Sequence, residues 1–93
     1  MESVLWYVLA GARGGPNRIR ILRALDERPW NANQLAAELD LDYTTVRHHL
    51  DVLTDHDVVK NSSDDYGTMY SLTDRVKDDW PLVEAVIERV EDD

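Results

Sequence analysis

Apolar residues recur along this chain at intervals of three and four, which is the spacing of an amphipathic helix, and polar breaks separate the runs. The pattern predicts a helix over residues 4–10 after a Ser3 cap, although the run VLWYVL is also compatible with a strand. After the flexible break GARGGPN, a second helix is predicted from Pro16-Asn17 to about Asp26. Residues 30–32 are expected to be short and extended.

Two further helices are predicted close together in the middle of the chain. Asn33 is the expected cap of the helix QLAAELD, and Asp42 is the expected cap of the helix after it. The inward stripe of the second helix is expected to contain Val46, His49, Leu50 and Leu53. Only Asp40 and Leu41 separate the two helices, so the spacing predicts a sharp helix-turn-helix crossing.

The pattern then changes to that of a hairpin and a final helix. The runs VVKNS and GTMYSL flank SDDY, which predicts two antiparallel strands with Gly67 closing the turn. Thr73-Asp74 starts a short turn, and Trp80-Pro81 opens a helix with a wide apolar stripe. The expected fold class is therefore mainly α with a small β-hairpin. We expect one domain, residues 1–93, with an N-terminal helix and linker (1–14), a core (17–72) and a C-terminal helix (73–93).

Composition narrows the possible functions. The chain has no cysteine, which excludes disulfides, thiolate metal sites and a cysteine nucleophile. It also has no glycine-rich phosphate loop and no nucleophile elbow, so we do not expect an enzyme. His49 is expected to be a hydrogen-bonded core residue while His48 and His56 point elsewhere, so no metal and no cofactor are expected. Without a long apolar run or an export signal, we expect a cytoplasmic protein that does not contact membranes.

The charge is strongly negative but unevenly distributed. There are 19 Asp and Glu against 10 Lys and Arg, for a net charge of -9, and most of this excess lies after residue 60. Between Ser3 and Leu25 there is no acid, and a local basic segment contains Arg13, Arg18, Arg20 and Arg23. Aspartate is abundant and lysine is scarce, which favours a salt-adapted surface of the haloarchaeal type over an ordinary acidic protein.

The helix that Asp42 begins has an unexpected outward face for so acidic a chain. Its outward positions hold Thr44, Thr45, Arg47 and His48, where carboxylates would be the default. Arginine donates two hydrogen bonds to guanine and threonine packs its methyl group on thymine, so this face suits the edges of DNA bases. Candidate phosphate contacts are Tyr43, His48, Arg13, Arg20 and Arg23. An ordinary solvated helix surface is the other interpretation.

Together these features resemble the ArsR-like winged helix-turn-helix regulators, from about Asn17 to Leu72. The resemblance rests on NRIRILRAL, on NQLAAELDLDYTTVRHHLDVLTDHDVV and on the hairpin as the wing. It implies a dimeric transcription regulator whose helix 42–55 enters the major groove of double-stranded DNA. It also implies a homodimer interface on the first and last helices, here Leu5, Trp6, Leu9, Leu82, Val83, Val86, Ile87 and Val90. Alternatively, these terminal stripes only cover the core of a monomer.

The chain departs from this family in three places. It lacks the cysteines and the paired acids and histidines of the metal-sensing branch, so metal sensing is not implied. Asp57 stands where the family usually has glycine after the recognition helix. The wing tip holds Asp64 and Asp65, which phosphate would repel unless salt screens the charges. The sequence therefore predicts a DNA-binding repressor, with a protein-interaction winged helix that does not bind DNA as the alternative.

Overall fold

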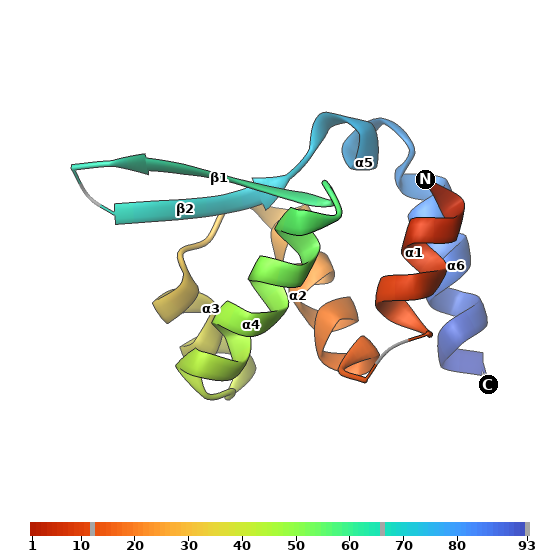
Figure 1. Ribbon diagram of the computed structural model, residues 1–93, viewed down its shortest axis with the longest axis horizontal. Helices are drawn as coiled ribbons and strands as arrows, with labels where there is room; N and C mark the ends of the chain where they lie inside the picture. The colour runs from red at the N-terminus through yellow and green to blue at the C-terminus, as the bar shows by residue number, and fades with distance from the viewer. Residues whose placement is uncertain (12, 66, 93) are drawn as a thin grey trace.

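The computed structural model describes residues 1–11, 13–65 and 67–92 (Figure 1). The elements in chain order are α1 (Glu2–Leu9), α2 (Gly15–Glu27), α3 (Ala32–Leu39), α4 (Tyr43–Asp55), β1 (Val59–Asp64), β2 (Gly67–Leu72), α5 (Asp74–Asp78) and α6 (Trp80–Asp92). The predicted mainly α fold with a small hairpin is confirmed, and the arrangement is that of a winged helix-turn-helix. No helix in the described ranges is long and apolar enough to cross a membrane.

Two of the predicted helix caps are wrong. Residues 2–9 are helical from the start, so Ser3 lies inside the first turn of α1 and does not cap it. α3 begins after Asn31 and not after Asn33, because Asn31 Oδ1 accepts a hydrogen bond from the Gln34 N–H at 2.7 Å. Gln34 Oε1 in turn accepts from the Asn31 N–H at 3.0 Å, which completes a capping box. Asp42 caps α4 as predicted.

The two helices of the helix-turn-helix end in the same way. Asp40 after α3 and Asp57 after α4 adopt left-handed backbone conformations, with φ of 54° and 59°. The residue that follows each aspartate donates its N–H to a carbonyl five positions earlier, Leu41 to Ala36 and Val58 to Leu53. These bonds are those of the Schellman motif, in which glycine is usual. Asp57 therefore takes the conformation of the glycine that it replaces.

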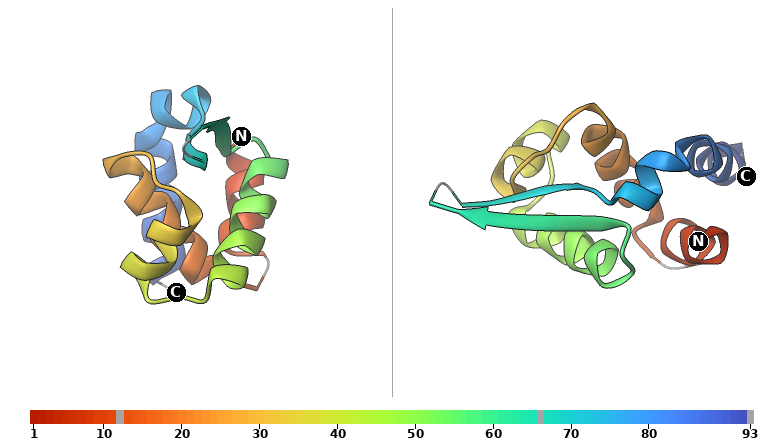
Figure 2. Two further views of the ribbon diagram at one scale, coloured as in Figure 1. Left: turned by 90° about the vertical axis from the view of Figure 1, so that its left-hand side faces the viewer. Right: turned by 90° about the horizontal axis from the view of Figure 1, so that it is seen from above.

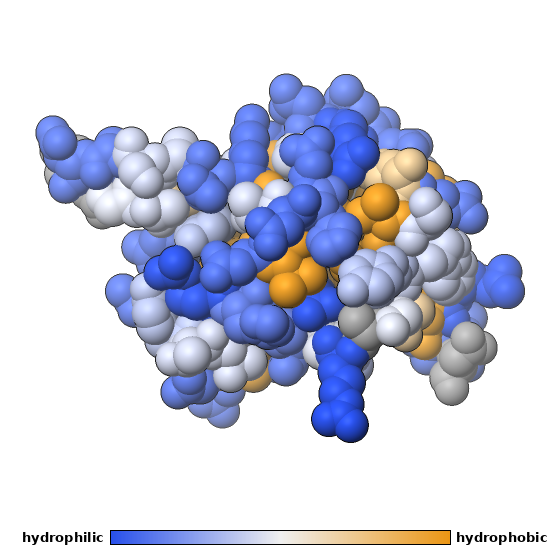
Figure 3. All heavy atoms as spheres, viewed as in Figure 1, coloured by the Kyte–Doolittle hydropathy of each residue, from blue (hydrophilic) through white to orange (hydrophobic). Residues whose placement is uncertain are grey.

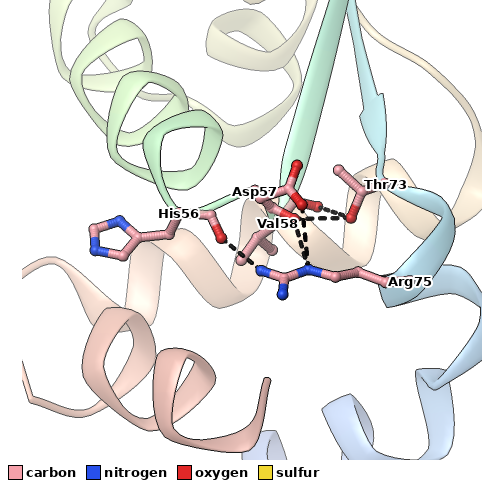
Figure 4. Close-up of polar contacts among 5 residues, drawn as sticks. All are labelled: His56, Asp57, Val58, Thr73 and Arg75. Atoms are coloured by element: carbon pink, nitrogen blue, oxygen red, sulfur yellow. Dashed lines mark hydrogen bonds and ion pairs between the residues drawn. The ribbon is translucent and has the colours of Figure 1, made fainter.

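Polar contacts hold the left-handed residue after α4 in place (Figure 4). The Arg75 guanidinium donates from Nη2 to the His56 carbonyl at 2.7 Å and from Nε to the Asp57 carbonyl at 3.1 Å. The Thr73 hydroxyl donates to the same Asp57 carbonyl at 3.0 Å. Since Arg75 lies in α5, these bonds connect the end of α4 to the segment after the hairpin.

The hairpin is antiparallel and carries a short extension on one side. β1 pairs with β2 from Val59↔Leu72 to Asp64↔Gly67, and Gly67 has the positive φ of 113° expected at the turn. Trp30 forms a bridge with Tyr70, and each residue donates its N–H to the carbonyl of the other. The predicted extended segment is thus found at Trp30 and Asn31 but not at Ala32, where α3 begins. The sheet is thereby fixed to the loop that precedes α3.

One cluster of buried apolar side chains joins the helices and the base of the hairpin. α1 and α6 pack side by side at the end of the molecule opposite the wing tip (Figures 1 and 2). The single chain buries five residues predicted for a dimer interface, Leu5, Leu9, Val83, Val86 and Ile87. These five side chains are therefore covered by their own chain. Trp6, Leu82 and Val90 remain half-buried, and Tyr7 is exposed.

Candidate nucleic-acid interface

The outward face of α4 is polar, as the periodicity predicts. Val46, His49, Leu50 and Leu53 are buried against the rest of the chain. The opposite positions leave Tyr43, Thr44, Arg47 and His48 exposed, and Thr45 is half-buried beside them. In Figure 3 the area over α4 and the hairpin is mainly hydrophilic, with small apolar areas beside α4 and toward α1. This face is therefore available to a polar partner.

A tyrosine fixes the direction of the arginine on this face. Arg47 Nη1 donates to the Tyr43 hydroxyl at 3.1 Å, and the guanidinium carbon lies 5.9 Å from the centre of the tyrosine ring. The hydrogen bond that Arg47 donates to Tyr43 raises the pKa of Arg47 above its ordinary value. One helical turn separates the two residues, so the side chains meet on the same side of α4.

Tyr43 and Arg47 border a hollow of about 190 Å³ between α4, the start of α3 and the wing. The residues that complete its lining include Asn33 from α3 and Thr68 from β2. The sequence analysis considered Asn33 only as a helix cap and did not single out Thr68. Thr68 could have been found from the hairpin register, since it lies one position after the turn glycine. The second strand of the wing and the outward face of α4 thus border the same hollow.

A second hollow, of about 400 Å³, brings Arg13 to the same helix. Its lining contains Arg13 and Gly14 from the loop before α2, and Thr44, Thr45, His48 and His49 from α4. The basic loop and the helix face are therefore adjacent in space although α2 and α3 separate them in the sequence. Arg13 supplies a positive charge beside His48.

Arg20 and Arg23 are placed elsewhere and make other contacts. Arg20 Nη2 donates to the Leu39 carbonyl at 2.5 Å, and this bond supplies a partner for one of the carbonyls at the C-terminal end of α3. Arg23 forms an ion pair of 2.6 Å with Glu91 of α6. Both arginines line a third hollow, of about 250 Å³, which contains no residue of α4. The structure therefore does not bring these two predicted phosphate contacts together with Arg13.

Arg18 differs from the other arginines because its side chain is inside the protein. Only 4% of Arg18 is exposed, and its Nε donates to His49 Nδ1 at 3.1 Å while Nη1 donates to the Val8 carbonyl at 3.1 Å. Burial lowers the pKa of Arg18 from its ordinary value, but a guanidinium keeps its proton in proteins. Burial, and after it the charges of Arg18 and His48, lower the pKa of His49, which is therefore neutral at pH 7. The interpretation of His49 as a hydrogen-bonded core residue is confirmed.

Within residues 1–11, 13–65 and 67–92, no three His, Cys, Asp or Glu side chains are grouped as they would be to hold a metal ion.

The protein-family model described as "Helix-turn-helix domain" matches residues 15–61, just over half of the chain. The chain belongs to the helix-turn-helix domain family. The match covers α2, α3 and α4 and reaches into β1, so it contains the face described above.

Solved structures similar to this helix-turn-helix protein extend the likeness to the whole chain. M.tuberculosis Rv0081 is 26% identical with a TM-score of 0.75, over 98% of this chain and 89% of that chain. The transcriptional regulator HlyU from Vibrio vulnificus is 25% identical with a TM-score of 0.68, over 90% and 88%. Reduced HlyU from Vibrio cholerae, 24% identical, has a TM-score of 0.70 over 90% and 82%, which supports the fold alone. None of the curated proteins matches this chain.

Proposed function

We propose that this helix-turn-helix protein is a sequence-specific transcription regulator that binds double-stranded DNA with α4 in the major groove. The observation that carries the proposal is the outward face of α4, where Tyr43 holds Arg47 in position and the Arg13 loop adds a positive charge. This arrangement has the two features that DNA recognition needs, which are donors for base edges and a cation for the backbone. The likeness to the regulator HlyU supports it.

In this proposal the residues of the face divide into two roles. Thr44, Thr45 and Arg47 read base edges, while Tyr43, His48 and Arg13 contact phosphates. Arg20 and Arg23 were equally plausible phosphate contacts from the sequence. Because each would first have to leave its partner, Leu39 or Glu91, we assign them a secondary role. No metal or cofactor is required.

We further propose that the regulator is a cytoplasmic homodimer that represses by occupying a promoter. A two-fold dimer places two copies of α4 about 34–36 Å apart, which matches successive major grooves on one face of DNA. The contact would use Trp6, Leu82 and Val90 with the exposed Tyr7, since these side chains are not fully buried by their own chain. A bound dimer excludes other proteins from the same DNA.

One observation favours a different function, that of a protein-interaction module without DNA binding. The wing carries Asp64 and Asp65, both exposed, at the tip that would approach the DNA backbone. Carboxylates there are repelled by phosphate except at high ionic strength. Binding of duplex DNA in dilute and in molar salt separates the two functions, since only the DNA-binding protein retains a preferred site.

The deciding experiment selects a preferred duplex from a random library in molar potassium chloride and measures binding by fluorescence anisotropy. Arg47→Ala should weaken binding to the selected duplex roughly ten- to hundredfold and reduce discrimination at one base pair. Arg23→Ala changes an exposed arginine that pairs with Glu91 and lines a hollow without α4 residues, so it should change binding little. Unchanged affinity and specificity for a folded Arg47→Ala would remove α4 as the reading helix and favour the protein-interaction function.

A further inference from the structure

We infer that the hollow between the Arg13 loop and α4 is a binding site for one phosphate of the DNA backbone, in which the buried His49 donates a hydrogen bond from Nε2–H. Nothing in the sequence pattern assigned His49 to the interface, because it lies on the inward stripe of α4. The inference deepens the proposed function and rests on it. It assigns Arg18 a role as a positioning residue that acts through His49.

The hydrogen bond from Arg18 determines which nitrogen of His49 carries the proton. A guanidinium has only donors, so the 3.1 Å contact requires Nδ1 of His49 to be the acceptor. A neutral imidazole whose Nδ1 accepts has its proton on Nε2. His49 also remains neutral, since the cation Arg18 and burial both oppose a second proton. His49 is therefore a donor of fixed tautomer.

The ring is also fixed in position. A Cβ at Gly14 would overlap Cε1 of His49, so the backbone of the loop before α2 packs directly on the imidazole. Gly14 has a φ of 90°, a conformation that favours glycine at this close approach. Arg18 in turn is anchored on the Val8 carbonyl at 3.1 Å. A donor held in this way needs no reorganisation when a ligand binds.

The remaining nitrogen of His49 is open to a ligand. His49 is only 5% exposed, and its Nε2 makes no hydrogen bond within the described part of the chain. Among the side-chain nitrogens and oxygens of these residues, only Thr54 Oγ1 is both sealed from solvent and without a hydrogen-bond partner. Because Nε2 of His49 has no partner and is not such an atom, it must be accessible to solvent. It is reached from the hollow of about 400 Å³ that His49 lines.

The other groups around the hollow suit a phosphodiester. Arg13 supplies a full positive charge, the Thr44 and Thr45 hydroxyls can donate, and His48 adds a ring nitrogen. Two phosphate oxygens with several lone pairs can accept from these donors together. The hollow lies where α4 meets the Arg13 loop, so a phosphate bound there would set the register of α4 in the groove.

The test uses the selected duplex with one phosphate at a time replaced by a neutral methylphosphonate. In the unmodified protein one replacement should weaken binding about three- to tenfold through loss of this contact. His49→Asn keeps an acceptor near Nδ1 for Arg18 but has no donor at the Nε2 position, so the same replacement should then weaken binding less, because only Arg13 and the hydroxyls still contact the phosphate. His49→Gln, whose amide reaches the Nε2 position, should restore most of it. Thermal melting of each variant checks the fold.

Arg13→Gln provides a second arm that does not depend on a core substitution. It should also reduce the effect of that methylphosphonate, and it should reduce the slope of log affinity against log salt by about 0.9. His49→Asn should leave the slope unchanged because His49 is neutral. If the penalties of the methylphosphonate and of both substitutions simply add, no phosphate occupies the hollow and the inference is overturned. A wild-type protein that prefers no duplex would instead overturn the proposed function.

Discussion

The Nε–H of Arg18 donates to Nδ1 of His49 across 3.1 Å inside the protein, 31 positions away along the chain. Arg18 belongs to α2 and His49 to α4, and the second bond of Arg18 reaches the Val8 carbonyl in α1. A single guanidinium thus connects the helix proposed to read DNA with the helix proposed to form the dimer. A buried polar group with satisfied partners fixes the relative position of these helices more specifically than apolar contacts alone.

Removing this guanidinium should therefore destabilise the fold. We expect Arg18→Met to lower the free energy of unfolding by about 2 kcal/mol, because the Val8 carbonyl and His49 Nδ1 would lose their donor in the interior. Arg23→Met is the matched control. Its ion pair with Glu91 is exposed, so its effect should stay within about 0.5 kcal/mol. Urea denaturation at fixed salt measures both, and equal effects would contradict a structural role for Arg18.

Stability should also fall when the solution becomes mildly acidic. The folded protein lowers the pKa of His49 below the ordinary histidine value of 6.5, chiefly through burial, whereas the unfolded chain takes up a proton near that value. The unfolded state then binds more protons just below pH 6.5, so the free energy of unfolding is highest above this pH and declines below it. Denaturation between pH 8 and pH 5.5 measures the slope. His49→Gln should flatten it, and a slope that survives this substitution would assign the effect to other groups.

The left-handed aspartates offer a stabilising substitution. Asp40→Gly should raise the free energy of unfolding by about 0.5–1 kcal/mol, since glycine adopts a φ of 54° without the steric penalty of a side chain. Asp40→Ala, which keeps a Cβ, should give no such gain. Asp57→Gly should gain less, because Asp57 Oδ2 lies 3.5 Å from Arg75 and this contact would be lost. Thermal denaturation ranks the stabilities of the three variants. If Asp40→Gly brings no gain in stability, the left-handed conformation does not strain Asp40.

The local pattern of apolar and polar residues was sufficient to predict the helix-turn-helix, but it could not predict contacts between segments that are distant in the sequence. Val46, Leu50 and Leu53 were found to be inward from period alone, since one face of a helix must be buried in any fold. The partner of Arg23 could not be found in this way, because Glu91 lies 68 positions away and only α6 brings it close. The acid-free segment of the sequence is therefore not acid-free in space.

The terminal helices show a second limit. An apolar stripe such as that of α6 has the same period whether its own chain or a second chain buries it. Val86 and Ile87 were assigned to a dimer interface, yet α1 and the core already cover them. The cap of α3 shows the same limit at smaller scale, since Asn31 and Asn33 are both good caps and only the bond from Gln34 distinguishes them.

The acidic surface leads to a prediction about salt. With 19 Asp and Glu against 10 Lys and Arg, most carboxylates must repel one another in dilute buffer. We propose that the surface is salt-adapted. We expect the melting temperature to rise steeply between dilute buffer and molar potassium chloride, because the Debye screening length falls to about 3 Å. Sucrose at equal osmolality controls for general exclusion effects. A melting temperature that is flat or falls with salt would contradict salt adaptation.

Assembly can be tested with residues that the single chain leaves partly exposed. If α1 and α6 form a two-fold interface, Trp6→Glu or Leu82→Glu should produce monomers that remain folded, because neither side chain is fully buried within its own chain. Val86→Glu is the contrasting variant. Only 2% of Val86 is exposed, so a charge there should unfold the chain whether or not it dimerises. Light scattering in molar salt gives the mass, and circular dichroism reports folding. A stable monomer for the unmodified protein would contradict the dimer and, with it, the spacing of two α4 helices on DNA.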